Sequence, residues 1–400
     1  MLRYLTAGES HGKLINAIIE GAPSGLPITG EEINMELRRR QMGYGRGGRM
    51  KIERDEVEIT SGVRFGKTTG APVSLQIRNR DWENWRTKMS IMPRNEEIQL
   101  LVHPRPGHAD LAGGLKYLEH DLRNILERSS ARETACRVAV GAIAKSLLNH
   151  FGVMVISHVT NIGGVEAKDL SRNPVELFRR AEHSEVRCAD RKSSEKMKAA
   201  IDKAKENGDS LGGIFEIIVK NPLAGLGNAF HWDRKLDAKL AYAVMSIQAI
   251  KGVEIGAGFN SADMLGSAYH DEIFLRKPNQ PHKGRNPWGG GFYRMTNNAG
   301  GIEGGITNGE NIIIRAVMKP IPTLMKPLRS VDIKTRKPFK AAIERSDVCA
   351  VPAAAVVAEA VVAFEVANAF MEKLGGDSLM EMENNFKAYT EAILKYAGRE

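Results

Sequence analysis

The sequence predicts an α+β fold in which antiparallel sheets pack against helices. Segments with strand character and segments with helix character do not follow the regular strand-helix-strand alternation of a doubly wound parallel sheet. Two long stretches rich in alanine and valine, residues 133–149 and 352–374, have the composition of closely packed interior helices. The 400 residues exceed the usual length of one domain, but no clear linker divides them.

The first part of the chain contains two expected strands and one expected helix. Residues 13–20 and 71–78 have the pattern of strands bounded by glycine or proline. Thr29, followed by two acidic residues and by apolar residues at Ile33 and Leu37, predicts a capped helix start. We expect this helix to deliver the arginines that follow it to a glycine-rich loop.

Two interior helices are expected further along the chain. The second begins with Pro352, which is tolerated in a first helical turn, and Gly375 is its expected terminator. Between the two helices we expect strands at 153–163 and 213–219, a charged surface helix at 193–207, and a helix at 235–247 that leads into Gln248-Ala249-Ile250-Lys251-Gly252.

Charge and composition limit the classes of function. The formal net charge of +9 raises the question of nucleic acid, because basic proteins gain phosphate affinity by counterion release. Against this, the basic residues at 38–49 and 276–285 are interleaved with glycine and proline rather than with aromatic residues, and there is no zinc-finger, RRM or KH signature. We therefore expect no nucleic-acid partner.

Cysteine usage and hydropathy indicate the compartment. Three widely spaced cysteines argue against a disulfide framework and against a zinc site, so no bound metal is expected. The N-terminus lacks the long apolar segment of a signal peptide, and the most apolar run, Val348–Ala358, is interrupted by Pro352. These features predict a cytoplasmic protein with no membrane-spanning segment.

Two regions far apart in the chain have residue types suited to the same anion. Gly8-Glu9-Ser10-His11-Gly12 precedes a stretch, residues 38–49, with five arginines among glycines, and Arg345-Ser346-Asp347 lies near the end. Guanidinium groups bind phosphate and carboxylate bidentately. A small acidic molecule is the expected ligand.

Each candidate residue also has a structural interpretation. His11 and His108 could be satisfied structural histidines, and Asp347 could pair with Arg345 or cap the helix that starts near Pro352. The glycines between 284 and 309 let backbone amides approach a ligand closely, but they also suit a flexible surface loop. They form neither a Rossmann fingerprint nor a Walker loop. Residue types and spacing alone leave these alternatives open.

Three regions of the chain carry distinctive motifs. They are Gly8 to Gly12 with Ile19-Glu20-Gly21-Ala22-Pro23, then Glu127-Arg128-Ser129-Ser130-Ala131-Arg132-Glu133-Thr134, and Arg345-Ser346-Asp347 with Glu359. In order and spacing they closely resemble the signature regions of chorismate synthase. Further similar segments are Arg39 to Arg49, Pro106 to Asp110, Gln248 to Glu254, Ala299 to Gly309 and Lys319 to Thr323. The resemblance covers residues 1 to about 375.

The resemblance implies a lyase that converts 5-enolpyruvylshikimate 3-phosphate to chorismate and phosphate by 1,4-anti elimination in the shikimate pathway. The family uses reduced FMN although the reaction has no net redox change. The resemblance further implies one domain over residues 1–400 with a helical tail at about 376–400, antiparallel sheets sandwiching a helical layer, and a homotetramer. NADPH or an external flavin reductase is the implied source of reduced flavin.

The resemblance also implies the site residues. The implied catalytic residues are His11, His108 and Asp347. The implied substrate contacts are Ser10, Arg46, Arg49, Arg105 and Arg132. The implied FMN contacts are Arg128, Ser129, Ser130, Gln248, Ala249, Gly304, Lys319, Pro320, Ile321, Pro322, Thr323 and Arg345. Arg40 and Arg46 match positions associated with NADP.

Two other functions are alternatives. A flavin oxidoreductase would also need these cofactor contacts, and a basic protein could hold a phosphoprotein or nucleic acid on its Arg/Gly loop. Absorbance of bound flavin separates the binding protein from both enzymes. Release of phosphate without net consumption of reductant separates the lyase from the oxidoreductase.

Overall fold

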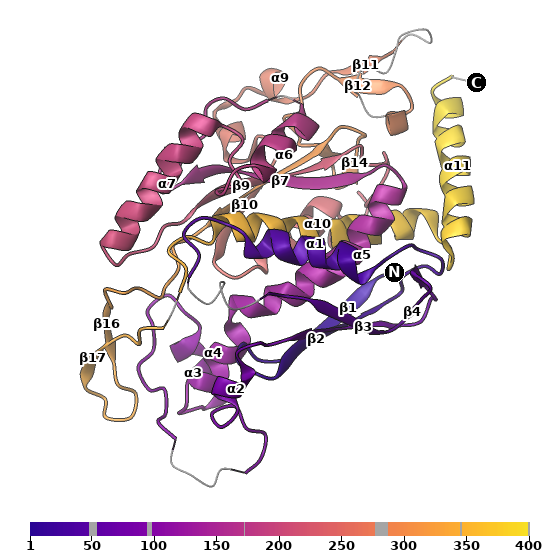
Figure 1. Cartoon of the computed structure of the whole chain (residues 1–400). Coiled ribbons are helices and arrows are strands. Elements are labelled where there is room, and N and C mark those ends of the chain that lie inside the picture. Colours follow the sequence, from indigo (N-terminus) through magenta and orange to yellow (C-terminus); the bar gives the residue numbers. More distant parts are fainter. Residues whose placement is uncertain (48–53, 94–97, 172, 277–286, 345, 399–400) are drawn as a thin grey trace.

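Two antiparallel sheets lie on either side of a layer of helices (Figure 1). The computed structural model describes residues 1–47, 54–93, 98–171, 173–276, 287–344 and 346–398. The strands within each of the two larger sheets are paired antiparallel. The expected α+β class, with antiparallel sheets sandwiching a helical layer, is confirmed.

The N-terminal sheet has four strands in the order β1-β2-β6-β3. Its strands are β1 (Arg3–Ala7), β2 (Leu14–Glu20), β3 (Val57–Ser61) and β6 (Val73–Arg78). Ile15, Leu75 and Ile77 are buried, whereas alternate residues of the same strands are half-buried or exposed. This alternation turns one face of the sheet toward the helices. The strands expected at 13–20 and 71–78 correspond to β2 and β6.

The second sheet has five strands in the order β10-β15-β9-β7-β8. Its strands are β7 (Met154–Ile162), β8 (Val165–Glu166), β9 (Gly213–Lys220), β10 (Ile250–Ile255) and β15 (Ile312–Met318). The strands expected at 153–163 and 213–219 are β7 and β9, which pair with each other in the sheet. Strand β10 is at one edge of this sheet, and the half-buried segment Gln248-Ala249 directly precedes it.

The layer between the sheets contains α1 (Gly30–Gln41), α5 (Thr134–His150) and α10 (Val351–Leu374). Helices α5 and α10 approach closely: a Cβ atom at Gly141 would clash with Ala360. Helix α10 is long and apolar enough to cross a membrane by composition, but 89% of its most apolar window is buried inside the protein. Burial on this scale is what a core helix requires, and both expected interior helices are confirmed.

Helix α1 begins as the sequence predicts. The Thr29 hydroxyl accepts from the N–H of Glu32 at 3.2 Å, and the Glu32 carboxylate accepts from the N–H of Thr29 at 2.7 Å. This reciprocal capping box satisfies N–H groups that a helix start would otherwise leave unpaired. The helix ends at Gln41, and Gly43 and Gly45 follow with φ of 136° and 82°. The arginines of its last turn therefore lead directly into a glycine-dependent loop.

Shorter elements surround these layers. The remaining helices are α2 (Trp82–Trp85), α3 (Asp110–Tyr117), α4 (Arg123–Ser129), α6 (Pro174–Glu182), α7 (Arg191–Glu206), α8 (Leu236–Met245), α9 (Gly266–Tyr269) and α11 (Leu379–Tyr396). The paired short strands are β4 (Val63–Arg64) with β5 (Lys67–Thr68), β11 (Ile273–Leu275) with β12 (Phe292–Arg294), β13 (Ile302–Glu303) with β14 (Ile306–Thr307), and β16 (Arg329–Val331) with β17 (Pro338–Lys340). The helices expected at 193–207 and 235–247 correspond to α7 and α8, and α11 makes the expected C-terminal tail helical.

A buried charge cluster joins the helix layer to the second sheet. Its members are Glu36, Arg39, Lys145, Glu182, Arg187 and Glu359. The Glu359 carboxylate is fully buried and accepts from Arg39 at 2.8 and 2.9 Å, from Arg187 at 3.1 Å, and from Lys145. Burial alone would raise the pKa of Glu359, but the three cations outweigh it and hold the pKa below its ordinary value.

Candidate functional site

His11 lies in the turn between β1 and β2 and is held by a carboxylate from α4. Its backbone N–H donates to Glu127 at 2.7 Å, and its Nδ1 lies 2.9 Å from the same carboxylate. The ring stacks on Trp85 with 3.8 Å between centroids. Because an ionised carboxylate accepts only, Nδ1 carries the proton that faces it. The ring is therefore fixed in orientation through Nδ1.

Glu127 is charged although it is buried. Its side chain is 1% exposed and also lies 3.5 Å from Arg123. Burial alone would raise the pKa of Glu127, but the hydrogen bonds and charge of His11 outweigh it and lower the pKa. A carboxylate that accepts from Nδ1 fixes the imidazole, and an oriented imidazole is the most common acid or base in enzymes. The pair therefore has the parts of a general acid.

Residues of the second signature region surround this pair. The Ser130 hydroxyl donates to the Ser10 hydroxyl at 3.1 Å, and the Ser10 N–H donates to the Glu127 carbonyl at 3.0 Å. The Ser129 hydroxyl donates back to the Ile125 carbonyl of its own helix at 2.7 Å. The structure thus brings Ser10, His11 and Ser130 together, while the hydroxyl hydrogen of Ser129 is used inside α4.

An open cleft lies next to this region. Its volume is about 380 Å³, and its lining residues are Tyr4, Leu5, Thr6, Arg128, Glu133, Arg137 and Gln248. Arg128 donates to the carbonyls of Thr6 and Gly8 at 2.8 and 3.1 Å, which ties the cleft to the loop of His11. The Oε1 atom of Gln248 is buried without a hydrogen-bond partner. A buried acceptor of this kind is available to a donor on a ligand.

A second cluster forms around His108 at the start of α3. The Asp110 carboxylate lies 2.6 Å from His108 Nδ1 and accepts from Arg105 Nε at 2.8 Å. Another guanidinium nitrogen of Arg105 lies 3.3 Å from His108 Nε2, and a third donates to the Thr323 hydroxyl at 2.8 Å. Burial alone would raise the pKa of Asp110, but hydrogen bonds from His108 and Arg105 outweigh it and hold the pKa well below its ordinary value.

The segment Lys319 to Thr323 connects the second cluster to the cleft. The Lys319 N–H donates to the Ala249 carbonyl at 2.9 Å, and its ammonium donates to the Gly107 carbonyl. The Ile321 carbonyl accepts from Ser210 at 2.7 Å. Ala249 follows Gln248 of the cleft, and Gly107 precedes His108. The segment Lys319 to Thr323 therefore lies between the two regions, and its assignment to FMN stays a prediction.

Asp347 pairs with the loop that follows α1. Its carboxylate lies 2.8 Å from Arg46 Nη1 and accepts from the Gly47 N–H at 2.6 Å. The helix-cap interpretation is wrong: α10 begins after Ala350 and has no side-chain cap. The alternative pairing with Arg345 lies outside the described residues. The structure instead brings together Arg46 and Asp347, which are 301 positions apart in the sequence.

Arg40 and Arg132 share a buried carboxylate. The two guanidinium groups approach opposite oxygens of Asp55, at 3.3 Å for Arg40. Arg40 also donates to Thr134 at 2.9 Å. All three charged side chains are less than 8% exposed. These contacts hold both guanidinium groups in place. The assignment of Arg40 to NADP and of Arg132 to the substrate stays a prediction.

Some predicted residues lie elsewhere or outside the described chain. Gly304 is in the turn between β13 and β14. The carbonyl of the next residue, Gly305, accepts from the N–H of Leu236 at the start of α8. Gln248 follows the other end of this ten-residue helix, about 15 Å away at 1.5 Å per residue. Gly304 is therefore not brought into the cleft within one chain. Arg49 and Arg345 fall outside the described residues.

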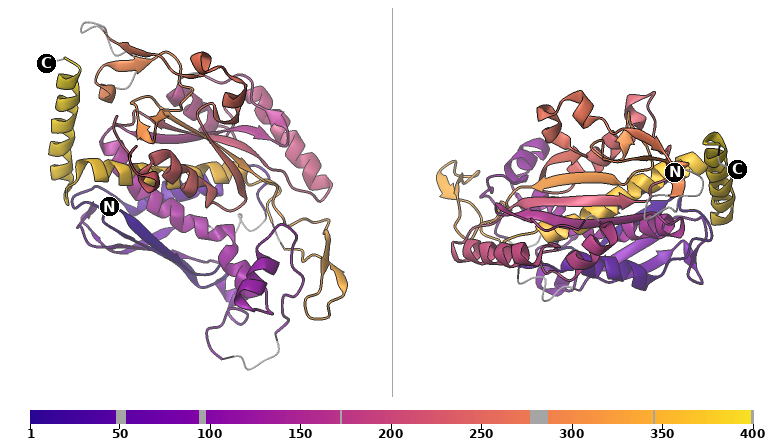
Figure 2. Two further views of the ribbon diagram at one scale, coloured as in Figure 1. Left: turned by 180° about the vertical axis from the view of Figure 1, so that it is seen from behind. Right: turned by 90° about the horizontal axis from the view of Figure 1, so that it is seen from above.

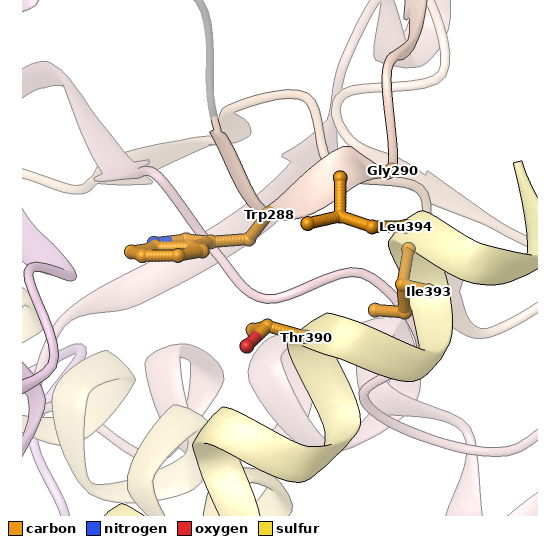
Figure 3. Close-up of a pocket in the computed structure, with 5 residues that line it drawn as sticks. All are labelled: Trp288, Gly290, Thr390, Ile393 and Leu394. Carbon is orange, nitrogen blue, oxygen red and sulfur yellow. The ribbon is translucent and has the colours of Figure 1, made fainter. Parts of the chain in front are cut away.

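A smaller pocket is separate from these clusters. It has a volume of about 80 Å³ and is lined by Trp288, Gly290, Thr390, Ile393 and Leu394 (Figure 3). Helix α11 contributes three of these side chains, and none of the five is a predicted site residue. Within the described ranges, no three His, Cys, Asp or Glu side chains are grouped closely enough to hold a metal ion.

Four residues that position the site had no assigned role in the sequence. They are Asp55, Trp85, Asp110 and Glu127. Two of them stand next to recognisable motifs: Asp110 follows His108 by two positions, and Glu127 opens the second signature region. Asp55 and Trp85 carry no local signal, because their partners Arg132 and His11 lie 77 and 74 positions away in the chain.

Comparison with known proteins gives one family. A family model described as chorismate synthase matches residues 2–371. Chorismate synthases from Pelobacter propionicus and Geobacter sulfurreducens are 60% and 59% identical over 394 residues, covering 98% of this chain and 99% of each relative. A chorismate synthase crystal structure has 45% identity and a TM-score of 0.78, with 98% of each chain covered. The chain belongs to the chorismate synthase family, whose members are lyases of the shikimate pathway.

Proposed function

We propose that this chain converts 5-enolpyruvylshikimate 3-phosphate to chorismate and phosphate by 1,4-anti elimination with reduced FMN as cofactor. One observation carries the proposal: two histidines, His11 and His108, are each oriented through Nδ1 by a buried carboxylate beside an arginine. An oriented imidazole next to a cation suits a substrate that bears a phosphate and two carboxylates. The reaction breaks the bond to phosphate and removes a ring hydrogen.

His11 is the proposed acid for the departing phosphate. Glu127 accepts from Nδ1 and fixes the ring, and the imidazole is proposed to deliver a proton as negative charge grows on the leaving oxygen. The stacking of Trp85 at 3.8 Å limits rotation of the ring. Glu127 and Trp85 are thus positioning residues for His11.

Arg105 and His108 are proposed to bind at the opposite side of the ligand. Arg105 is 7% exposed and is neutralised by Asp110, which keeps its planar group fixed for a bidentate contact. His108 accepts from Arg105 through Nε2 and donates to Asp110 through Nδ1. This arrangement fixes the orientation of the His108 ring beside the Arg105 guanidinium.

The cleft beside Arg128 fits the requirements of FMN. Its volume of about 380 Å³ lies within the roughly 300–1,000 Å³ range of ligand pockets, and the buried Oε1 of Gln248 suits a ring N–H. Arg128, Gln248, Ala249 and the segment Lys319 to Thr323 would hold the cofactor. Bound reduced FMN would supply an electron-rich ring that assists phosphate departure and takes up the hydrogen lost by the substrate.

Asp347 is proposed to act beside the loop that follows α1, where it pairs with Arg46. Its carboxylate is 19% exposed and has oxygens directed at Arg46 and at the Gly47 N–H. It is therefore fixed, charged and still reached by solvent. Such a group can accept a proton during the loss of the ring hydrogen.

An anaerobic assay tests this function against the two alternatives. Chorismate and phosphate should form in equal amounts with FMN reduced by dithionite, and no further reductant should be consumed. Reductant consumption in step with turnover would favour the flavin oxidoreductase. Absence of any flavin-binding signal or turnover would favour the basic binding protein.

The source of reduced flavin needs a separate experiment. If Arg40 and Arg46 serve NADPH, then NADPH alone should support turnover with FMN under anaerobic conditions. Turnover with dithionite but not with NADPH would assign the reduction to an external flavin reductase. The same samples, run on a sedimentation experiment, test the proposed homotetramer.

A further inference from the structure

The hairpin β16–β17 carries a concentrated positive charge. Residues 324–343 contain six basic residues and a single acid, Asp332. The six are Lys326, Arg329, Lys334, Arg336, Lys337 and Lys340, and all are exposed. None of them forms an ion pair with another described residue. Asp332 is engaged with His103 at 3.2 Å and with the N–H groups of Lys334 and Thr335 at 2.8 Å.

This hairpin is fixed next to the Arg105 cluster. The Ile333 N–H donates to the Val102 carbonyl at 3.1 Å, and the Ala342 N–H donates to the His103 carbonyl at 3.4 Å. The rings of His103 and Phe339 stack with 3.9 Å between centroids. Arg105 is three residues beyond Val102, which is about 10 Å of extended chain. The cations are therefore held within one or two Debye lengths of the proposed anion site.

The hairpin projects from the body of the protein instead of covering it. Figure 2 shows it at one edge, with α11 at the opposite edge. Exposed cations that contact no acid spread their potential into solvent, where they act on an approaching anion before any contact forms. A bound ligand needs close donors, but an approaching one is affected by charge at a distance.

We propose that this hairpin steers the phosphorylated, dicarboxylate substrate toward the Arg105 cluster, raising its association rate and lowering its dissociation constant. The inference rests on the proposed function, because that function supplies the anionic substrate. Nucleic acid fits the hairpin less well. The segment 324–343 has one aromatic residue, Phe339, and its ring is stacked on His103, whereas single strands are bound on open aromatic faces.

The test removes charge from the hairpin without touching its contacts. The triple variant Lys334→Gln, Lys337→Gln, Lys340→Gln changes three exposed side chains for which no described residue supplies an ionic partner. The control triple, Lys67→Gln, Lys387→Gln, Lys395→Gln, lowers the net charge equally with exposed residues in β5 and α11. Helix α11 and β4, the strand that pairs with β5, lie across the molecule from the hairpin (Figure 1). Association of substrate is followed by stopped-flow with FMN-loaded, reduced enzyme.

At ~20 mM ionic strength the hairpin triple should associate with substrate roughly tenfold more slowly, with kcat within about twofold of the parent. In ~0.5 M salt the difference should fall below about twofold, because screening removes the field. The control triple should match the parent within about twofold at either salt concentration.

Three results would overturn the proposal. Equal losses in both triples would assign the effect to net charge, and a loss that persists in high salt would assign it to direct contact. Unchanged substrate association, with single-stranded DNA binding that depends on the hairpin, would make nucleic acid the partner. The failure of the proposed function is a separate result: the parent chain would then release no phosphate from the substrate under any condition.

Discussion

Two charged regions of this molecule contain the same residue types but use them in different roles. In the buried charge cluster, three cations meet three carboxylates, and Glu359 accepts hydrogen bonds from Arg39, Lys145 and Arg187. Along the cleft and the Arg105 cluster, carboxylates instead hold side chains in place at the solvent boundary: His11 is 13% exposed and His108 is 17% exposed.

The difference lies in how the carboxylates are used. Glu359 is enclosed by its partners and stabilises the junction of α1, α5, α10 and β7. Glu127 and Asp110 each orient an imidazole through Nδ1 and leave Nε2 directed elsewhere. Charge that is matched inside the protein supports the fold, whereas a charge pair that reaches the surface can act on a ligand. The following variants test this distinction, from the largest effect to the smallest.

Removal of Glu359 should have the largest effect. Glu359→Leu leaves three cations buried near an apolar side chain, and such unpaired charge costs about 3–5 kcal/mol in the free energy of unfolding. Because the folded-state pKa of Glu359 is depressed, its contribution is present above the ordinary pKa of 4.5 and is lost as the pH falls below that value. Urea unfolding at pH 7 measures the loss. A change of less than about 1 kcal/mol in the free energy of unfolding would contradict a stabilising role for the buried Glu359 carboxylate.

Removal of His11 should lower turnover without unfolding the protein. His11→Ala is expected to reduce kcat by roughly 10²–10⁴-fold, the usual share of a general acid. His150 is a matched control because it too contacts a carboxylate: its Nε2 lies 2.6 Å from Glu383. It is the last residue of α5, away from the predicted site residues. His150→Ala should leave kcat within about twofold. A similar kcat in the two variants would indicate that His11 has a structural role only.

Asp347→Asn separates charge from shape in the pair with Arg46. The amide keeps the size of the side chain and can still accept from the Gly47 N–H. It cannot accept a proton, and its attraction to Arg46 is weaker. We expect FMN binding within about threefold of the parent and a fall in turnover of roughly 10²-fold. Flavin titration and steady-state kinetics measure both, and loss of the fold would show that the ion pair with Arg46 is structural.

Asp110→Asn should have a smaller, pH-dependent effect on stability. The variant removes the charge that neutralises Arg105, at a cost of about 1–3 kcal/mol at pH 7. The folded-state pKa of Asp110 is depressed, so its contribution is present above the ordinary value of 3.8 and is lost as the pH falls below it. Unfolding curves of the two proteins should converge in acid. A constant difference from pH 7 to pH 3 would show that charge is not the cause.

Some of these elements and site residues could be predicted from local patterns in the sequence. The capping residues Thr29 and Glu32 predicted the start of α1, and the composition of residues 352–374 predicted α10, since both depend on neighbouring residues alone. The signature regions identified His11 and His108 through resemblance. The alternative interpretation of Asp347 as a helix cap was wrong, because its partner Arg46 is far away in the chain.

The parts that the sequence did not reveal depend on contacts between distant segments. Asp55 meets Arg132 across 77 positions, and Trp85 stacks on His11 across 74 positions. The β16–β17 hairpin was also missed, because its three-residue strands contain lysine and arginine and show little apolar alternation. Its position is determined by residues 102–104, which carry no pairing signal of their own.

The smallest effect is expected for a carboxylate that is neither enclosed nor part of the site. Glu176 lies in the first turn of α6 and accepts from Arg179 and Arg180 at 2.8–3.0 Å. These hydrogen bonds lower its pKa to about 2.

Exposed pairs gain little, because water solvates the separated charges nearly as well. Glu176→Ala should therefore shift Tm by less than about 2 °C at pH 7. Any contribution should be present above the ordinary pKa of 4.5 and should be lost as the pH falls from 4.5 through about 2, because the unfolded chain binds a proton there before the folded carboxylate does. Calorimetry at pH 7 in low and high salt checks this. A loss as large as that of Glu359→Leu would show that the number of ionic contacts, and not their enclosure, determines what a carboxylate contributes.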